Sequence, residues 1–389
     1  MIAVELRTLP ILIIHIVLDK ETFAWYIIGN RGNPQNEEEI AVKFTSKVAT
    51  ASAVAVLALV LGACGNSKSG SKAAGKTDKA HSVALVTDGG GVDDKSFNQS
   101  EWEGLQKWGK KNNLAKGVGG YNYAQSNSDA DFVPNVNKMI QAGYKTIIGS
   151  GYKLEKTVSD AAKKNPKVNF VIIDDVIKQK NVASATFKDN ESAFLAGVAA
   201  AMTTKTNKVG FIGGVHGEVI DRFEAGFRQG VAAVNKNIKV DVKYADSFSK
   251  ADVGQALAQA MYNNNEDVIY QAAGGTGAGV FSAAKNAIKS KKVWVIGVDR
   301  DQTADGKYKG GNVTLTSTVK GVDIAVQKLA TAAKNDKFPG GKTQVYGLKG
   351  NGVRLVRGNM SSKAWTKVQE FKEKIIKGDI SVAEKPSDL

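Results

Sequence analysis

The sequence predicts an α/β protein made of two doubly wound lobes with a cleft between them. Three observations lead to this prediction. Short apolar runs alternate with helical runs from residue 81 onward, as in parallel sheets that helices cover on both faces. The alternation restarts near residue 208, where a second unit of similar length begins. Gly and Asp residues follow the strand ends of both units, where open α/β sheets bind their ligands.

The first unit contains apolar runs that are short enough to be buried strands. They are the runs 81–88, 144–151 and 168–175, with 182–189 as a further strand or a connection. A helix is predicted from about residue 98 to 111, and helical segments precede the second and third runs. Because these strands are almost continuously apolar, both faces of their sheet should be covered.

The second unit repeats the pattern and then ends differently. Its predicted strands are 208–215, 238–246, 266–274, 293–301 and 313–320, and its helices are 218–235, 251–263 and 277–289. A helix over 321–335 follows, then a hairpin around 345–356 in "VYGLKGNGVRLV". A charged amphipathic helix over 362–377 ends the pattern.

The region before Cys64 has the layout of a secretory signal. Lys43 and Lys47 precede the apolar run "VATASAVAVLALVLGAC", a short positive region followed by apolar and then small residues. The stretch Leu61-Gly62-Ala63-Cys64 resembles the bacterial lipobox, in which the cysteine thiol receives a lipid after cleavage before the cysteine. A membrane-spanning helix needs about 20 apolar residues, so we expect a signal peptide at 42–63 and a lipid anchor, with acyl chains such as palmitate, on Cys64.

Residues on either side of this signal are not expected to join the folded part. Residues 1–41 contain an apolar run broken by charges at 19–21 and then an acidic cluster, so we expect an upstream extension with the true start of translation near Val42. Peptides from residues 1–41 in cellular mass spectra would contradict this. Residues 64–80 are rich in Gly, Ser and Lys and are predicted to be a flexible tether.

The charge balance is basic but does not predict nucleic-acid binding. The chain of 389 residues has 53 Lys and Arg against 38 Asp and Glu, a formal charge of +15. The lysines are scattered without a long basic block, which favours solvated faces and attraction to an anionic envelope. Cys64 is the single cysteine, so no internal disulfide can form.

The motifs of common enzymes and metal sites are missing from the chain. Only His81 and His216 follow Cys64, which argues against metal clusters and Ser-His catalysis. The "GGKT" stretch lacks the first glycine of a phosphate-binding loop because residue 336 is Asp, and "GGTGAG" is followed by Val280. The acidic "DGGGVDD" stretch lacks the spacing of a calcium loop. We therefore expect no enzyme, no metal and no cofactor.

Several stretches together resemble the basic membrane protein family, the substrate-binding lipoproteins of ABC importers. They are the lipobox, "ALVTDGGGVDDKSFNQ", "IIGSGY", "FVIIDD", "ESAFLAGVAA", "KVGFIGG", "FEAGFRQG" and "VIGVDRDQ". The resemblance covers residues 81–377. Its most specific parts are the D-x-S-F-N-Q and G-V-D-x-D-Q stretches.

The resemblance implies a fold and a set of lobe boundaries. The fold is the type I periplasmic-binding fold, two Rossmann-like lobes joined by crossovers that act as a hinge. We expect an N-lobe at 81–189, a C-lobe at 190–317 and a return to the N-lobe at 318–340. The hairpin and last helix, 341–389, are placed with the C-lobe, although the sequence leaves the lobe of that helix open.

The resemblance also implies a ligand, a purine nucleoside of the adenosine, guanosine and inosine class. Phe97 matches the first stacking phenylalanine and Phe223 the second, with Phe227 one helical turn away as its alternative. Stacking on an aromatic ring contributes about 1–3 kcal/mol per base. The alternative for both Phe97 and Phe223 is a structural role in the core.

Carboxylates would bind the polar edges of the nucleoside, because they accept strong hydrogen bonds in a dry cleft. Asp174 matches the base-reading aspartate of the family, with Asp175 as its rival. Asp299 matches the ribose-binding aspartate and Lys320 the sugar-binding lysine. Each carboxylate could instead cap a helix that follows its strand.

Three further positions complete the expected site. Gly274 or Gly275 would let the backbone approach the sugar, and Asn98 and Asp88 are expected as additional contacts. The implied function is a monomeric, lipid-anchored receptor on the outer face of the cell membrane that passes its ligand to an ABC permease. The same fold binding a sugar or an autoinducer, and a surface adhesion or signalling lipoprotein, remain as alternatives; a nucleosidase is disfavoured by the missing histidine and metal chemistry.

Overall fold

The computed structural model describes residues 12–19, 22–29 and 75–389. The chain divides into two compact units, Met1–Lys72 and Ala73–Leu389. In the first unit, β1 (Leu12–Asp19) pairs antiparallel with β2 (Thr22–Gly29). Cys64 and the predicted signal peptide lie outside the described residues. The predicted boundary of the tether at residue 80 is wrong, because Lys76 pairs in parallel with Leu114 of the folded part. Of the helices that the structure describes, none has the length and apolar character that a bilayer-spanning helix needs.

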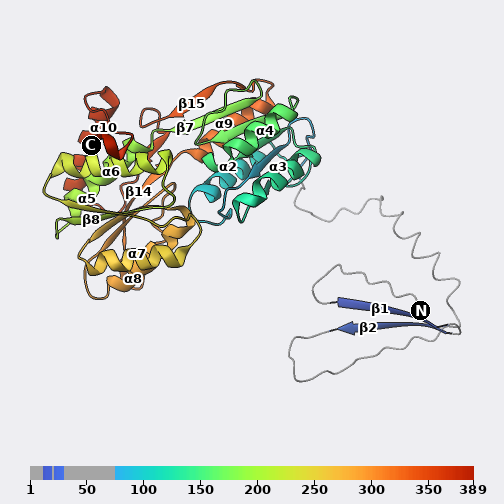
Figure 1. The fold of residues 1–389 in the computed structure, drawn as a ribbon, viewed down its shortest axis with the longest axis horizontal. Coiled ribbons are helices and arrows are strands. Elements are labelled where there is room, and N and C mark those ends of the chain that lie inside the picture. The colour runs from blue at the N-terminus through green and yellow to red at the C-terminus, as the bar shows by residue number, and fades with distance from the viewer. Residues whose placement is uncertain (1–11, 20–21, 30–74) are drawn as a thin grey trace. The chain divides into compact units, whose positions relative to one another are not determined.

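The N-lobe is a six-stranded parallel sheet with helices on both faces (Figure 1). Its strand order is β15-β7-β6-β5-β3-β4. The strands are β3 (Val83–Val86), β4 (Tyr121–Ala124), β5 (Thr146–Gly149), β6 (Asn169–Ile173), β7 (Val182–Phe187) and β15 (Thr343–Tyr346). Its helices are α2 (Phe97–Lys111), α3 (Phe132–Gln141), α4 (Glu155–Lys164) and α9 (Val322–Lys334). Strand β4 was not predicted, because "YNYA" is short and only partly buried.

The C-lobe repeats this architecture around the sheet β16-β14-β11-β10-β8-β9. Its strands are β8 (Lys208–Gly213), β9 (Lys239–Tyr244), β10 (Val268–Ala272), β11 (Trp294–Gly297), β14 (Thr314–Lys320) and β16 (Val353–Leu355). Its helices are α5 (Asp189–Thr203), α6 (Glu218–Val234), α7 (Ala251–Asn263), α8 (Gly277–Ala287) and α10 (Ser362–Lys377). A small ribbon, β12 (Lys307–Tyr308) with β13 (Gly311–Asn312), precedes β14. Short 3₁₀ turns lie at Asp129–Asp131, Tyr152–Leu154, Gly274–Thr276 and Pro386–Asp388.

The two sheets share one topology, which fixes where a ligand can bind. In each lobe the second strand along the chain lies at one edge and the first strand pairs with both the second and the third. The order therefore reverses at the first strand, β3 in the N-lobe and β8 in the C-lobe. Open α/β sheets bind ligands outside the carboxyl ends of their strands near such a reversal.

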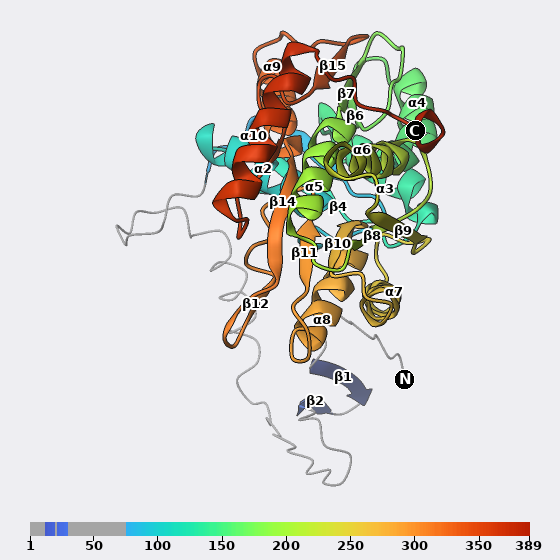
Figure 2. The same ribbon diagram turned by 90° about the vertical axis from the view of Figure 1, so that its left-hand side faces the viewer.

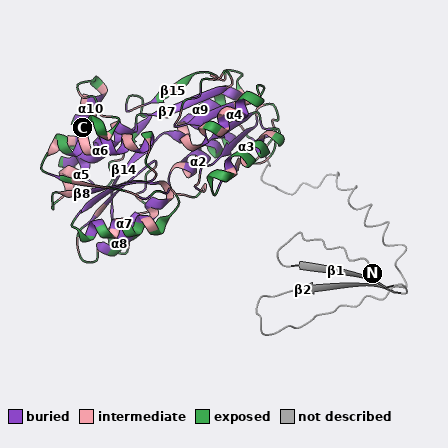
Figure 3. Ribbon diagram, viewed as in Figure 1, coloured by how far each residue is buried: buried purple, intermediate pink, exposed green. Residues whose placement is uncertain are grey.

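Alternation along β3 shows how the sheet separates two parts of the core. Val83 and Leu85 belong to one buried cluster, which continues into the C-lobe through α5 and α6. Ala84 and Val86 belong to a second cluster with α3 and α4. Because successive side chains of a strand point to opposite faces, this short strand is buried on both sides. Figure 3 shows the same pattern, with buried strands between helices that expose one face.

The predicted hairpin at 345–356 is wrong. Strand β15 pairs in parallel with β7 of the N-lobe, whereas β16 pairs antiparallel with β14 of the C-lobe. The chain crosses between the lobes where a local turn was expected, because each strand extends the edge of a different sheet. Helix α10 then packs against α5 of the C-lobe (Figure 2).

Candidate ligand-binding site

A cavity of about 60 Å³ lies between the lobes, at the carboxyl ends of the strands of both sheets. The residues predicted as ligand contacts all line it. They are Asp88, Phe97, Asn98, Asp174, Phe223, Gly274, Asp299 and Lys320. The structure thus brings together residues that are spread over more than half of the chain.

The alternative ligand contacts that the sequence left open do not line the cavity. Phe227 is fully buried in the C-lobe core, where its ring centroid lies 5.3 Å from that of Tyr270. The Asp175 carboxylate accepts a hydrogen bond from the Val176 N–H and does not line the cavity. Gly275 is likewise outside the lining, next to Gly274.

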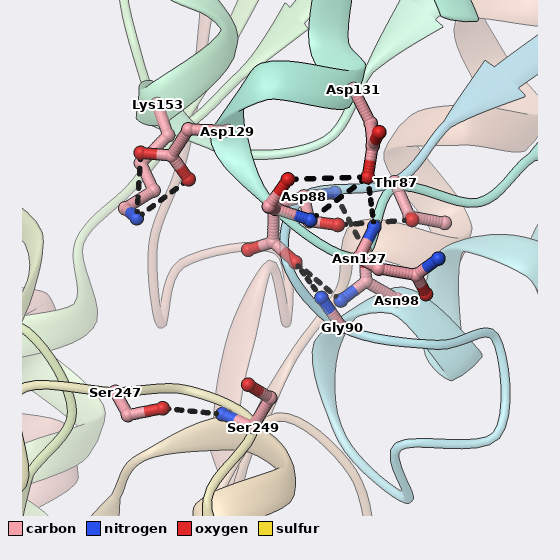
Figure 4. Close-up of polar contacts among 11 residues, drawn as sticks. Thr87, Asp88, Gly90, Asn98, Asn127, Asp129, Asp131, Lys153, Ser247 and Ser249 are labelled. Carbon is pink, nitrogen blue, oxygen red and sulfur yellow. Dashed lines mark hydrogen bonds and ion pairs between the residues drawn. The ribbon is translucent and has the colours of Figure 1, made fainter.

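The acidic loop after β3 is held by its own side chains (Figure 4). Asp88 Oδ1 accepts hydrogen bonds from the Gly90 N–H at 2.9 Å and from Asn98 Nδ2 at 2.8 Å. Asp94, which the sequence did not single out, accepts from the main-chain N–H groups of Ser96, Asn98 and Gln99. Asp94 therefore satisfies donors at the start of α2 that no earlier residue of the helix can satisfy. This loop places Phe97 at the first position of α2.

Two glycines allow the main chain to come close to the cavity. A Cβ atom on Gly90 would lie 2.6 Å from Asn98 Nδ2, which would push away the side chain that holds Asp88. Gly274 has φ of +56°, a left-handed conformation that side chains disfavour. Its main chain lines the cavity at the end of β10.

The aromatic rings come from opposite lobes and differ in burial. Phe97 is half-buried and packs on the edge of the N-lobe core. Phe223, on α6, is only 3% exposed and lies 6.3 Å from Tyr270, centroid to centroid. Both line the cavity, so a flat ligand between the lobes would meet a ring from each side.

Two cavity aspartates have a left-handed backbone. Asp174 follows β6 with φ of +68°, and Asp299 follows β11 with φ of +65°. Among non-glycine residues, Asp and Asn tolerate this region best. Such conformations gather at ligand sites, where the surrounding structure holds a side chain in a required direction.

Lys320 joins the two lobes at the centre of the site. Its Nζ lies 2.6 Å from Asp174 Oδ2 and 3.3 Å from Asp189 Oδ2. The same ammonium lies 5.0 Å from the ring centroid of Phe187, 5.4 Å from that of Phe97 and 5.6 Å from that of Phe223. Burial by itself lowers the pKa of Lys320, but the attraction of the surrounding carboxylates outweighs it and raises the pKa above its usual value. The lysine is therefore a fixed cation.

Burial raises the pKa of several carboxyl groups around the cavity. The pKa of Asp299 rises to about 7, even though Lys320 and the Ser96 hydroxyl oppose the rise. Burial also raises the pKa of Asp88 to about 6, against the hydrogen bonds from Asn98 and Gly90. Beneath them, Glu101 is fully buried and bonded to Ser150, and burial raises its pKa well above the usual range. Asp88 and Asp299 therefore change charge between about pH 6 and 7.

Other residues of the lining were not among the predicted ligand contacts. Gly151 and Tyr152 follow β5, at one of the strand ends that the sequence associates with the cleft, and both line the cavity. The Tyr152 hydroxyl oxygen is buried and has no hydrogen-bond partner among the described residues. Phe248 also lines the cavity from the loop after β9. Nothing local in its sequence distinguishes it, because only the packing of the lobes brings that loop to the cleft.

Comparisons with known proteins agree with this geometry. Residues 81–385 match the family model described as ABC transporter substrate-binding protein PnrA-like. The chain is 54% identical over 340 residues to the CD4+ T-cell-stimulating antigen of Listeria monocytogenes, covering 84% of this chain and 95% of that protein. It is 52% identical over 346 residues to the ABC transporter nucleoside-binding protein BmpA of Lactococcus lactis, covering 86% and 98%.

Solved structures support the fold. An ABC transporter solute-binding protein from Aeropyrum pernix superposes with a TM-score of 0.70 at 23% identity, covering 78% of this chain and 94% of that one. The fold is the type I periplasmic-binding fold that the resemblance implied. Substrate-binding proteins of ABC importers work outside the cytoplasm and bind small molecules without transforming them. With the match over residues 81–385, the chain belongs to the PnrA-like family of ABC transporter substrate-binding proteins.

Proposed function

We propose that this chain is a membrane-anchored receptor that captures purine nucleosides between its lobes and delivers them to an ABC permease. The observation that supports this best is the composition of the cavity wall. Phe97 and Phe223 reach it from opposite lobes, together with the carboxylates and with Lys320. The flat apolar rings of the cavity suit the faces of a purine, and its carboxylates suit the N–H groups of the base and the hydroxyl groups of the ribose.

The polar groups of the cavity have capacity left for a ligand. Asp174 Oδ2 is paired with Lys320, whereas Asp174 Oδ1 has no hydrogen-bond partner among the described residues. That oxygen can accept a base N–H group. Asp299 accepts from Ser96 through Oδ2, which leaves Oδ1 for a ribose hydroxyl, while Lys320 can donate to the sugar oxygens.

The cavity must enlarge before a nucleoside can enter. Its volume of about 60 Å³ holds a few water molecules, whereas sites for small ligands span about 300–1,000 Å³. Opening of the lobes about the crossovers after β7, β14 and β15 would admit the ligand, and closure would bring Phe97 and Phe223 onto its two faces.

The name of a close relative supports the same ligand class. The Lactococcus lactis protein that shares 52% identity is named a nucleoside-binding protein. Its alignment spans most of this chain and includes both lobes. The Asp, Phe and Lys residues of the cavity provide the chemistry for a similar ligand here.

Calorimetric titration tests the proposal directly. We expect inosine, guanosine or adenosine to bind, and the matching free base to bind much more weakly. A base without its sugar leaves Asp299 and Lys320 buried without ligand partners, at a cost of about 1–3 kcal/mol or more. Binding of free sugars with no binding of nucleosides would overturn the ligand class. Equal affinity for adenine and adenosine would remove the sugar role from both residues.

The anchor is tested separately through Cys64. If a lipid is attached there, Cys64→Ser should release the protein into the medium or leave an uncleaved precursor. Nucleoside binding by the purified variant should be unchanged, because the cysteine belongs to the predicted tether region and not to the cavity. A variant that is still processed and membrane-bound would contradict the anchor.

A further inference from the structure

Gln302, the last residue of the G-V-D-x-D-Q stretch, does not line the cavity but occupies a buried position beside it, 2% exposed. We propose that Gln302 is a positioning residue. It couples closure of the lobes to the orientation of the Asp299 carboxylate, which binds the ligand. This inference rests on the proposed function of the cavity and concerns how that cavity retains its ligand.

Within the C-lobe, two hydrogen bonds hold the side chain of Gln302 and a third holds its main chain. Its Oε1 accepts from the Val298 N–H at 2.9 Å and from Gln271 Nε2 at 2.8 Å. Its main-chain N–H donates to Ser317 Oγ at 3.1 Å. Because Val298 immediately precedes Asp299, these bonds hold the strand end from which the Asp299 carboxylate projects. The two donors on Oε1 also fix which side the amide NH₂ group faces.

The amide NH₂ group reaches across the cleft. Gln302 Nε2 donates to the Lys95 carbonyl oxygen of the N-lobe loop at 2.9 Å. The next residue of that loop, Ser96, donates through Oγ to Asp299 Oδ2 at 2.6 Å. Two consecutive residues of one lobe, Lys95 and Ser96, are thus bonded to Gln302 and Asp299 of the other, which lie three positions apart. We call these two bonds the seam.

The seam borders the site on the side of Phe97. Lys95 and Ser96 directly precede Phe97, and Lys95 has a left-handed backbone with φ of +58°, which turns its carbonyl group. The seam can form only when the lobes are closed, since its donors and acceptors belong to different lobes. It occupies Asp299 Oδ2 and sets the direction of the carboxylate, so that closure and presentation of Oδ1 to the ligand occur together.

Outer ion pairs near the seam cannot replace it. Arg300 lies 3.3 Å from Glu103, and Lys95 Nζ lies 3.5 Å from Asp305. Their side chains are partly or largely exposed, and exposed pairs contribute little because water and salt screen them. The buried amide and hydroxyl bonds are the contacts that a closed, dry site would strengthen.

The test replaces only the cross-cleft donor. Gln302→Glu keeps an acceptor for Val298 and Gln271 but places a carboxylate against the Lys95 carbonyl. At pH 8 we expect inosine to bind about tenfold more weakly or worse, mainly through faster dissociation in stopped-flow measurements. At lower pH the introduced carboxyl group becomes protonated and can donate again, so the ratio of variant to wild-type affinity should recover. The ratio is used because Asp299 titrates in both proteins.

Gln179→Glu is the matched control. Gln179 Nε2 also donates to a main-chain carbonyl, that of Ser159 at 3.1 Å, but both residues belong to the N-lobe. The affinity of the Gln179→Glu variant for inosine should stay within about twofold of wild type at each pH. A loss in Gln302→Glu that does not change with pH, or an affinity within twofold of wild type at pH 8, would overturn the proposal.

Ser96→Ala decides the matter if Gln302→Glu does not fold. It removes the other bond of the seam by a small truncation, and we expect several-fold faster dissociation of inosine. An unchanged dissociation rate would overturn the proposal. When both variants fold, their combined effect should be smaller than the product of the single effects, because both act on one closed seam.

Hydrogen exchange separates this inference from the nucleoside proposal. In the ligand-free full chain, Gln302→Glu should speed amide exchange in residues 95–99 of the opposite lobe, and Gln179→Glu should not. Equal exchange there in Gln302→Glu and wild type would overturn the seam. If wild type fails to bind any nucleoside while this difference in exchange is seen, the ligand class is wrong and the seam stands.

Discussion

The two walls of the cavity are built in different ways. On the N-lobe side, Phe97 is half-buried and follows a loop whose shape comes from internal bonds of Asp88 and Asp94. On the C-lobe side, Phe223 is almost fully buried within α6 and contacts Tyr270 of the central strand β10. Under the proposed function, Phe97 would contribute mainly to ligand binding, whereas Phe223 would contribute to both ligand binding and the stability of the C-lobe core.

The buried charged residues do not belong to one wall each, because their ion pairs connect the two walls. Lys320, at the end of β14 of the C-lobe, pairs with Asp174 of the N-lobe and with Asp189 at the crossover. A change at Lys320 should therefore affect both walls at once, while changes at the rings should affect one wall each. The following predictions, in order of decreasing expected effect, test this contrast.

Removing the buried cation should have the largest effect. Lys320→Met would leave Asp174 buried without its cationic partner and Asp189 with only Arg222, at 3.7 Å. We therefore expect the free energy of unfolding to fall by about 3–5 kcal/mol and nucleoside binding to be lost. Urea unfolding measures the first and calorimetry the second. Lys292→Met is the control, since Lys292 is exposed and its Nζ lies over the Trp294 ring, 5.4 Å from the ring centroid. A Lys320→Met protein as stable as wild type would show that the pair is not a structural link.

Truncation of the C-lobe ring should reduce stability and affinity together. Phe223→Ala removes a buried ring, and we expect it to lower the free energy of unfolding by about 3 kcal/mol. The folded variant should also bind nucleoside more weakly. Phe227→Ala provides the comparison, because Phe227 lies in the core and outside the cavity. It should lose stability but keep its affinity; a Phe223→Ala protein that behaves in the same way would remove the stacking role.

Truncation of the N-lobe ring should reduce affinity alone. We expect Phe97→Ala to weaken nucleoside binding by about 1–3 kcal/mol, or about 5- to 150-fold, with little change in melting temperature. Phe97→Tyr and Phe97→Trp should keep much of the affinity, because a flat face remains. A large drop in melting temperature with normal binding would make Phe97 a structural residue.

The ligand-free protein should lose stability as pH rises above about 4, through two overlapping ranges that end near pH 6 for Asp88 and near pH 7 for Asp299. Folding raises the pKa of Asp88 to about 6 and that of Asp299 to about 7, from an ordinary 3.8. A raised carboxyl pKa means that the folded state binds the proton more tightly, so this stabilisation is complete below about pH 4. It is lost as pH rises through the pKa of the folded state, at no more than about 1.4 kcal/mol per pH unit for one group.

The two walls can be separated by variants in this experiment. In urea unfolding between pH 5 and 8, Asp299→Asn should gain stability relative to wild type up to about pH 7. Asp88→Asn should show its relative gain mainly below about pH 6. A difference between Asp299→Asn and wild type that stays constant with pH would contradict a titrating Asp299.

Particular elements show what could be predicted from the sequence. Strand β10 and helices α7 and α10 lie where the local pattern placed them, because burial of an apolar face follows directly from residue periodicity. Asp88, Gly274 and Asp299 could be placed at the cleft because ligand sites in this topology follow strand ends. Phe223 and Lys320 were implied only by the resemblance to the family. The seam was not predicted, although the Gln302 motif was noticed, because its partner is a main-chain carbonyl more than two hundred positions earlier.

The sequence by itself determined the α/β class, most of the strands and helices apart from β4 and α5, and the residue types at the strand ends, since these depend on neighbours in the chain. The tertiary structure alone decided that β15 and β16 join different sheets, that Phe223 and not Phe227 lines the cavity, and that Lys320 pairs with Asp174. Edge-strand partners, ring orientation and buried ion pairs depend on groups distant in sequence. No local pattern encodes those contacts, because they form only when the two sheets pack around a shared cleft.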